Sequence, residues 1–377
     1  MKSSVFFSDL KVESGKTLLD KLDILLDRAD LKGKIGEKDL VAIKLHFGEK
    51  GNTAYVRPIF LRRVVDRVKQ YKGKPFLTDT NTLYGGTRSE AVSHLTTALE
   101  NGFTESGVNA PILIADGLRG NSAVKVRIDK PIFKTVSVAR EIYMADGLIT
   151  VTHFKGHELS GFGGALKNLG MGCASREGKL SQHSNISPQV NGKACKGCKA
   201  CLGWCAQEAI SLRLPQPEVE TKHSIAFIDP KKCVGCGECI LTCPSAAVQI
   251  QWNESVPIFQ KKMVEHAYGA IQKKKSKTLY LNFLTQVSPA CDCYGYSDTP
   301  IVNDIGILSS EDPVAIDQAS VDLVNGQEGN RSSKLTGAWE PGEDKFRAIY
   351  PQVDWTVQLA YAEEIGLGTR EYELIKI

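Results

Sequence analysis

The order of apolar and polar positions along the first part of the chain alternates between helical and strand patterns. Apolar residues from Leu18 to Leu31 recur at the spacing of an amphipathic helix. The run LVAIKLHF, Leu40 to Phe47, predicts a buried strand, and Phe76 to Thr80 predicts another. Pro58 suits the first turn of a helix that we expect to continue through Tyr71.

The same alternation continues on both sides of a cysteine-rich segment. Gly102 suits the residue that follows a helix. The further predicted elements are helices at 88–101 and 260–272, a helix after Pro313, and strands at 111–115, 148–152 and 278–284. Strands that alternate with helices favour a mostly parallel sheet covered by helices on both faces. The fold class predicted is therefore an α/β body.

The alternation stops near Ser187 and resumes after Pro257. We expect an N-terminal α/β part at 1–186, an insert at 187–254, and a C-terminal part at 255–377. The last part either completes the same body or forms a second lobe. The run KKKSK at 273–277 suits a solvated helix end, because lysine is favourable near helix C-termini. A docking patch is the alternative for this run.

Composition narrows the class of protein. The chain has 377 residues, of which 42% are hydrophobic and 24% charged, with a net charge of +4. This charge is too small to indicate binding to nucleic acid or to an anionic membrane. No apolar run is long enough to span a membrane, and the first residues lack the apolar stretch of a signal peptide. We therefore expect a cytoplasmic protein. Its eleven cysteines then lie in a reducing compartment, where clustered cysteines bind metal more often than they form disulfides.

Eight of these cysteines form two runs with the same spacing. Each run reads C-x₂-C-x₂-C-x₃-C, and the second is followed by Pro244. This is the spacing of proteins with two [4Fe–4S] clusters, in which the fourth cysteine of each run binds the cluster of the other run. Glycines at 197, 235 and 237 allow the backbone to wrap closely around a cluster. The predicted ligands are Cys195, Cys198, Cys201 and Cys243 for one cluster, and Cys233, Cys236, Cys239 and Cys205 for the other.

The insert resembles the bacterial two-cluster ferredoxins over about 60 residues, which implies an α+β module. It departs from their pattern at Ala206, where a proline is expected, but no ligand is lost. A pair of zinc knuckles is the alternative. Zinc does not require the third cysteine of each run, so the cluster interpretation is favoured.

A glycine-rich segment, 151–183, carries a second set of reactive side chains. Its composition suits a backbone that lies against a ligand, and it holds His153, His157, Lys167 and His183. The whole chain resembles the bacterial and archaeal family called domain of unknown function 362, especially in LTDTNTLYGG, THFKGHELSG, ALKNLGMGCA, CDC and DPVAID. That family has no established reaction.

The segment from His157 to His183 also resembles the nickel-dependent lactate racemases. This resemblance implies an acid–base role for His157, a covalent tether to a pincer nucleotide for Lys167, and a metal-binding role for His183. The chain departs from that family between Asn81 and Thr87, where the family carries another acid–base histidine and this chain has none. A simpler alternative is that Lys167 binds a phosphate or carboxylate.

Three cysteines lie outside the two runs. Cys291 and Cys293 are separated by one residue, and their side chains are expected to diverge in an extended chain, which disfavours a disulfide. Together with Cys173 and His183 they are candidates for a third metal site. The alternative is that Cys173 packs as a small buried residue.

Several other residues are candidates for the site or for the fold. Asp312, before Pro313, suits a helix N-cap. Asp304 and Asp317 lie near it in the sequence, and Asp304 is a candidate for the same cleft. His46 ends a predicted strand, where the sites of α/β proteins are found.

These observations favour an iron–sulfur protein that transfers electrons to or from a site in the α/β body, which makes an oxidoreductase the first enzyme class to consider. The redox partner and the substrate are not specified by the sequence. One alternative is an isomerase or oxidoreductase with a metal or nucleotide cofactor at Lys167 and His183. Another is an assembly or binding protein whose clusters are structural.

Overall fold

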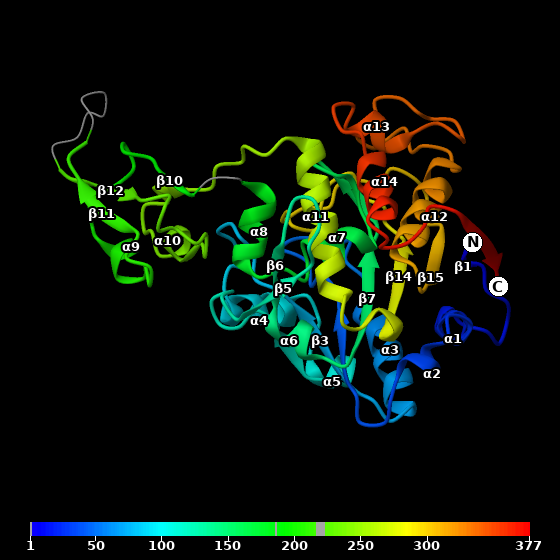
Figure 1. The fold of residues 1–377 in the computed structure, drawn as a ribbon. Coiled ribbons are helices and arrows are strands. Elements are labelled where there is room, and N and C mark those ends of the chain that lie inside the picture. The colour runs from blue at the N-terminus through cyan, green and yellow to red at the C-terminus, as the bar shows by residue number, and fades with distance from the viewer. Residues whose placement is uncertain (1, 185–186, 216–222) are drawn as a thin grey trace.

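One mostly parallel sheet of eight strands forms the centre of the molecule (Figure 1). The computed structural model describes residues 2–184, 187–215 and 223–377. Only β15 runs against its neighbours; the other strands share one direction. In order across the sheet the strands are β16 (Tyr372–Lys376), β1 (Ser3–Asp9), β15 (Gly306–Ser310), β14 (Thr278–Leu284), β7 (Gly147–His153), β2 (Leu40–Lys44), β3 (Lys74–Asp79) and β4 (Ile112–Ile114).

Strands from both sides of the insert are neighbours in this sheet. β14 follows the insert, and it pairs in parallel with β7, which precedes it. β1 lies between β15 and β16, so the first strand of the chain is enclosed by its last two. The parts of the chain before and after the insert therefore contribute to one α/β body.

The side chains of the central strands alternate between two hydrophobic cores, as a strand period of two requires. In β14, Tyr280 and Leu284 face one core, and Leu279, Leu281 and Phe283 face the other. Helices α7, α11, α12 and α14 contribute to the first core, and α1 and α3 to the second. The predicted α/β body with helices on both faces is confirmed.

The helices lie between the strands in chain order. Those of the body are α1 (Leu18–Arg28), α2 (Leu31–Lys34), α3 (Pro58–Gln70), α4 (Ala91–Glu100), α5 (Glu105–Val108), α6 (Arg140–Met144), α7 (Ala165–Gly170), α8 (Arg176–His183), α11 (Val256–Ile271), α12 (Pro313–Asn325), α13 (Lys345–Ile349) and α14 (Thr356–Glu364). Two hairpins accompany them: β5 (Ala123–Arg127) with β6 (Thr135–Ala139), and β8 (Lys155–His157) with β9 (Gly161–Gly163).

Most of the predicted elements are present, with shifted ends. The predicted helix at 18–31 divides into α1 and α2 because Asp30 adopts a left-handed conformation and caps α2. Gly102 follows α4 with a φ of +86°, and Asp312 caps α12 by accepting from the N–H groups of Val314 and Ala315. The interpretation of KKKSK as a solvated helix end is wrong for Lys274. Its side chain is buried, and its ammonium donates to the carbonyls of Ile142 and Tyr143.

The insert extends away from the body between α8 and α11 (Figure 1). Its elements are β10 (Gln189–Val190), α9 (Ala200–Gly203), β11 (Ile210–Arg213), β12 (Ile225–Ile228), α10 (Glu238–Leu241) and β13 (Val248–Gln249). β10 pairs with β13, and β11 pairs with β12. The predicted boundary at residue 186 lies outside the described residues. No helix in the described part of the chain has both the length and the apolar character needed to cross a membrane.

Candidate functional site

A cavity of about 580 Å³ opens at the carboxyl ends of the central parallel strands. In open α/β sheets this edge is where ligands bind. β2 and the residues after it contribute Lys44 and His46, β3 contributes Asp79, and the loop after β14 contributes Cys293. His157, Lys167 and His183 line the same cavity, so the segment 151–183 meets the strand ends here.

The segment Cys291–Asp292–Cys293 forms a turn at the cavity wall. The N–H of Tyr294 donates to the carbonyl of Cys291 over 3.1 Å. This turn brings the two sulfur atoms to 2.9 Å from each other, whereas an extended chain would separate them. The hydrogen bond from Cys291 and the charge of Lys167 hold the pKa of Cys293 well below its usual value, despite burial. The pKa of Cys291 is raised by the same hydrogen bond and by burial.

Asp292 anchors this turn from the side opposite to the sulfurs. Its fully buried carboxylate contacts His153 Nδ1 at 2.8 Å and Lys155 Nζ at 3.1 Å. Burial alone would raise the pKa of Asp292, but the charges of His153 and Lys155 hold it well below the ordinary value. His153 is the last residue of β7 and Lys155 lies two residues later, so these contacts tie the turn to the central sheet.

Lys167 points from helix α7 toward the two thiols. Its Nζ lies 3.3 Å from Cys291 Sγ, and although burial opposes it, the negative charge at Cys291 and Cys293 raises the pKa of Lys167. Asp317 fixes the start of α7, because its carboxylate accepts from the N–H groups of Ala165 and Leu166. The start of helix α7 is therefore fixed, and it holds the Lys167 ammonium group next to Cys291.

Two histidines lie across the cavity from the thiols. His157 and His183 both stack against Phe259, with ring centroids 6.4 and 4.8 Å away. Burial lowers the pKa of His183 to about 3, and burial with the nearby Lys167 charge lowers that of His157. Both rings are therefore neutral at pH 7. His157 Nδ1 accepts from the backbone N–H of Ser160, so its Nε2 carries the proton and is a donor.

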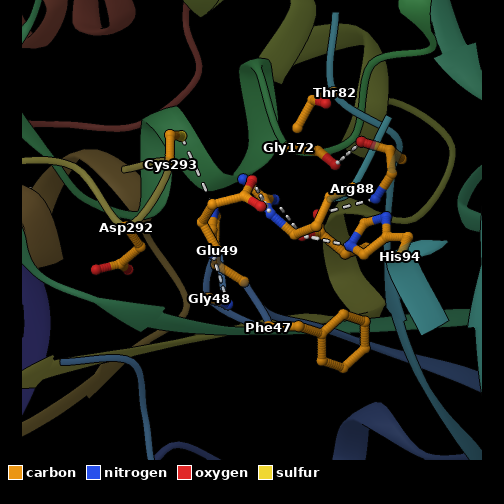
Figure 2. A network of polar contacts seen from close by, with 12 residues as sticks. Phe47, Gly48, Glu49, Thr82, Arg88, His94, Gly172, Asp292 and Cys293 are labelled. Carbon is orange, nitrogen blue, oxygen red and sulfur yellow. Dashed lines mark hydrogen bonds and ion pairs between the residues drawn. The ribbon is translucent and has the colours of Figure 1, made fainter. Parts of the chain in front are cut away.

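A network of buried charges forms the wall near β3 (Figure 2). Asp79 contacts Lys44 at 2.9 Å, and Arg88 lies 3.1 Å from Glu49 and 3.7 Å from Asp79. Burial would raise the pKa of Asp79, but the charge of Lys44 overcomes it and holds the pKa well below the usual value. His94 packs edge-on against Phe47 and lies 3.7 Å from Asp79. These paired charges hold the loop after β3 in place.

Lys179 differs from the other cations of the cavity in its partners. Its ammonium donates to Thr80 Oγ1 and to the carbonyls of Asn81 and Ala174. Among the residues that the structure describes, no carboxylate lies within ion-pair distance of it. Burial lowers the pKa of Lys179 to about 8.

Helix α8 lies where the cavity meets the insert, and its residues contact both. Lys179 and His183, four residues apart, line the cavity. Arg176 and Leu180, also four apart, face the second cysteine run. A Cβ added to Gly237 would lie 2.8 Å from Arg176 Cδ, and one added to Gly235 would lie 3.5 Å from Leu180. Because an α-helix has about 3.6 residues per turn, positions 176, 179, 180 and 183 share one side of α8, and the cavity and the insert adjoin along that side.

The insert consists of two copies of one local structure, offset by 38 residues. The residues two and four positions after the first cysteine have positive φ in both copies: Gly197 and Lys199, then Gly235 and Gly237. A short helix follows in each, α9 and α10. In each copy the N–H four residues after the last cysteine donates to its sulfur, Ala209 to Cys205 and Ala247 to Cys243.

The eight cysteines of the insert gather around two cavities, and each set combines both copies. The first cavity, of about 10 Å³, is lined by Cys195, Cys198, Cys201 and Cys243. The second, of about 200 Å³, is lined by Cys205, Cys233, Cys236 and Cys239. Each set is made of three cysteines from one run and the last cysteine of the other. Four thiols are the donor set of an iron–sulfur cluster.

The structure does not bring all the predicted site residues together. Cys173 is buried in the first core and is not part of the cavity wall. Asp304 accepts from the N–H of Gln286 at the surface. Within the described ranges, no group of three or more His, Cys, Asp and Glu side chains is arranged to hold a metal ion. Ligands of a cluster bind different irons, so they lie farther apart than the ligands of one ion.

The sequence pattern of one family, described as a domain of unknown function (DUF362), matches residues 41–322. The chain belongs to the DUF362 family. The match includes every strand of the cavity and the whole insert. The membership expected from the motifs is thus confirmed.

Two solved structures are similar to this DUF362 chain at low identity. One is the lactate racemase apoprotein from Thermoanaerobacterium thermosaccharolyticum, with 12% identity, a TM-score of 0.37, and 84% of this chain covered. The other is a protein from Thermotoga maritima, with 10% identity, a TM-score of 0.34, and 92% covered. The DUF362 chain spans 58% of the length of each. No curated protein matches it.

Sequence reasoning identified only part of the cavity of this DUF362 protein. It placed His46, His157, Lys167 and His183 among the site residues. All four line the cavity, and His46 Nε2 lies 3.7 Å from Cys293 Sγ. It missed residues whose neighbours in space are distant in the sequence. Those residues are Glu49, Asp79, Arg88, Lys155, Lys179 and Asp292. A usable signal was present at Asp79, a charged residue at the end of an apolar strand.

Proposed function

We propose that this DUF362 protein binds two [4Fe–4S] clusters in its insert and exchanges electrons between them and the cavity of the α/β body. Cys195, Cys198, Cys201 and Cys243 would hold one cluster, and Cys233, Cys236, Cys239 and Cys205 the other. Such clusters supply one-electron oxidation and reduction. The insert would then be a ferredoxin-type module at 187–254.

The donor set of the insert supports this assignment. Each small cavity is lined by four thiols in the combination that exchanges the last cysteine between runs. The backbone N–H groups of Ala209 and Ala247 already point at cysteine sulfurs, and such hydrogen bonds are known to tune cluster potentials. Positive φ values at Gly197, Gly235 and Gly237 keep the loops close to the thiols without steric cost.

The position of helix α8 is the observation that carries the redox proposal. Arg176 Nη1 lies 3.8 Å from the carboxylate of Glu238 in the second run, while Lys179 and His183 of the same helix line the cavity. A second contact reinforces it, because a Cβ on Gly237 would lie 3.7 Å from Leu83, which also lines the cavity. One layer of side chains therefore separates the second thiol set from the cavity.

The cavity residues indicate an anionic reaction partner. Lys167 and Lys179 present ammonium groups, and the buried carboxylates Asp79 and Asp292 are occupied by other cations. A small carboxylate or phosphate ester would bring a negative charge near Lys179, whose three N–H groups donate to neutral oxygens. His157 and His183 are neutral, and His157 can donate a hydrogen bond from Nε2 to such a ligand.

The proposal is tested by anaerobic purification followed by iron, sulfide and electron paramagnetic resonance measurements. We expect about eight irons and eight labile sulfides per chain, and signals that appear on reduction with dithionite and disappear on reoxidation. Colourless protein without labile sulfide would refute the proposal. Clusters that never reduce reversibly would instead favour a structural role in a binding or assembly protein.

A second candidate function is an isomerase or oxidoreductase with a metal or nucleotide cofactor at Lys167 and His183. It is favoured by one observation, that His157, Lys167 and His183 all line one cavity. In this structure Lys167 is held as an ammonium beside Cys291, and a covalent tether would require its neutral form. Mass spectrometry of natively produced protein decides, because an unmodified Lys167 peptide in active protein excludes the tether.

A further inference from the structure

We infer that Cys291 and Cys293 form a redox-active dithiol–disulfide pair that accepts two electrons at the cavity wall. The inference deepens the proposed function, because it names the group in the body that the clusters would serve. It starts from the distance between the sulfurs, which is 2.9 Å in the folded chain.

Side chains from other parts of the body hold two residues of the turn, Asp292 and Cys293, in place. Asp292, the residue between them, is fixed by His153 and Lys155, and Figure 2 shows its side chain leaving the turn in a different direction from Cys293. Tyr84 donates its hydroxyl to the carbonyl of Cys293 over 3.3 Å. A rigid turn that already places two thiols in contact needs little rearrangement to close or open a disulfide.

The charges around the pair match the needs of disulfide reduction. Lys167 Nζ lies 3.3 Å from Cys291 Sγ, and His46 Nε2 lies 3.7 Å from Cys293 Sγ. A thiolate leaving group is stabilised by a nearby cation, and the other sulfur needs a proton donor. Lys167 serves both needs, since its ammonium faces the pair.

The electron balance is simple. The disulfide takes two electrons and one proton, the S–S bond breaks, Cys291 becomes a thiol, and Cys293 becomes a thiolate. Two one-electron carriers in the insert match this demand, and an external one-electron donor restores them. Lys167 gives the proton to Cys291 and recovers one from solvent. A two-electron oxidant of the azo class, such as diamide, takes the two electrons and the proton from the pair, and the S–S bond forms again.

A short route joins the insert to this pair. A Cβ added to Gly237 would lie 3.7 Å from Leu83, the residue after Leu83 is Tyr84, and the Tyr84 hydroxyl donates to the carbonyl of Cys293 over 3.3 Å. The route therefore crosses the narrow gap between the Gly237 backbone and Leu83, follows the chain to Tyr84, and ends in one hydrogen bond. Cys173, the other cysteine of the body, lies in the hydrophobic core away from the cavity wall and has no such connection.

The experiment is thiol trapping on the whole protein, kept free of oxygen. Protein treated with diamide, and protein then reduced with dithionite, are each alkylated with N-ethylmaleimide and digested. The peptide that contains Cys291 and Cys293 is weighed. We expect no label and a mass lower by two hydrogens after diamide, and two labels after dithionite. Two labels under both conditions would overturn the inference.

Electron counting supplies an independent measurement. In a dithionite titration, the wild-type protein should take up about two more electrons per chain than Cys291→Ser/Cys293→Ser. The matched control Cys173→Ala should behave as wild type. An equal count in the wild type and the double variant would overturn the inference, as would a bound metal ion that is lost in the double variant.

These outcomes are separate from those of the proposed function. Iron and sulfide content reports on the clusters, whereas the peptide mass reports on the thiol pair. Intact clusters with an inert pair would refute this inference alone. A cycling pair in protein without iron would refute the proposed function alone.

Discussion

Replacing Asp292 with asparagine removes one negative charge from a fully buried site while keeping the size of the side chain. Asp292 is 0% exposed, and its partner Lys155 is 6% exposed. The substitution leaves the Lys155 ammonium buried without a counter-charge, beside neutral acceptors such as the carbonyl of His153 at 2.7 Å. Removing one partner of a buried ion pair costs about 3–5 kcal/mol. Because total stabilities are about 5–15 kcal/mol, this loss is a large fraction of the whole.

The assay is urea unfolding at pH 7 without oxygen, followed by far-ultraviolet circular dichroism, which reports mainly on the body. Adding Lys155→Met should recover about 2 kcal/mol or more, because the uncompensated charge is then removed as well. Asp129→Asn is the matched control. Asp129 pairs with Arg127 on the surface, where such pairs contribute about 0–1 kcal/mol. A loss below about 1 kcal/mol for Asp292→Asn, or strictly additive costs in the double variant, would refute the reasoning.

Three further predictions concern packing, pH and the insert. Gly170→Ala should reduce the free energy of unfolding by about 1–3 kcal/mol and lower the melting temperature, because the added Cβ would lie 2.1 Å from the Met263 carbonyl. The control Gly203→Ala, whose Cβ would enter open space, should leave the melting temperature unchanged. Burial lowers the pKa of His266 to about 4, so the stabilisation from its neutral form is complete above pH 6.5 and lost as pH falls through 4. Between pH 7 and 4, the unfolding free energy of wild type should fall by about 3 kcal/mol more than that of His266→Gln; parallel curves would contradict this. Cys205→Ala should remove the cluster of the second run and about half of the iron, while full iron content would exclude Cys205 as a ligand.

The elements that the sequence predicted well are those with a strong local signal. The helix that begins at Pro58 and the strand at 278–284 were located within a residue, because proline and continuous apolar runs act locally. β1 and β16 were missed, and both lie at one edge of the sheet, where half-exposed strands carry a weaker apolar pattern.

The site was harder to predict than the fold. The spacing of cysteines identified the two thiol sets, because metal ligation constrains neighbours in the sequence. The contacts of Asp292 with His153 and Lys155 join positions about 140 residues apart, and no local pattern encodes them. The proximity of Cys291 to Cys293 depends on a turn, and the expectation of an extended chain led away from it.

Each copy of the insert supplies its last cysteine to the thiol set of the other copy. This arrangement limits how related chains can gain or lose the insert. Each cavity is completed by a residue from the other copy, Cys243 in one case and Cys205 in the other. Deleting either copy would therefore open both cavities rather than halve their number. Relatives of this chain should carry the duplicated segment whole or lack it entirely, since an intermediate with a single copy keeps neither thiol set.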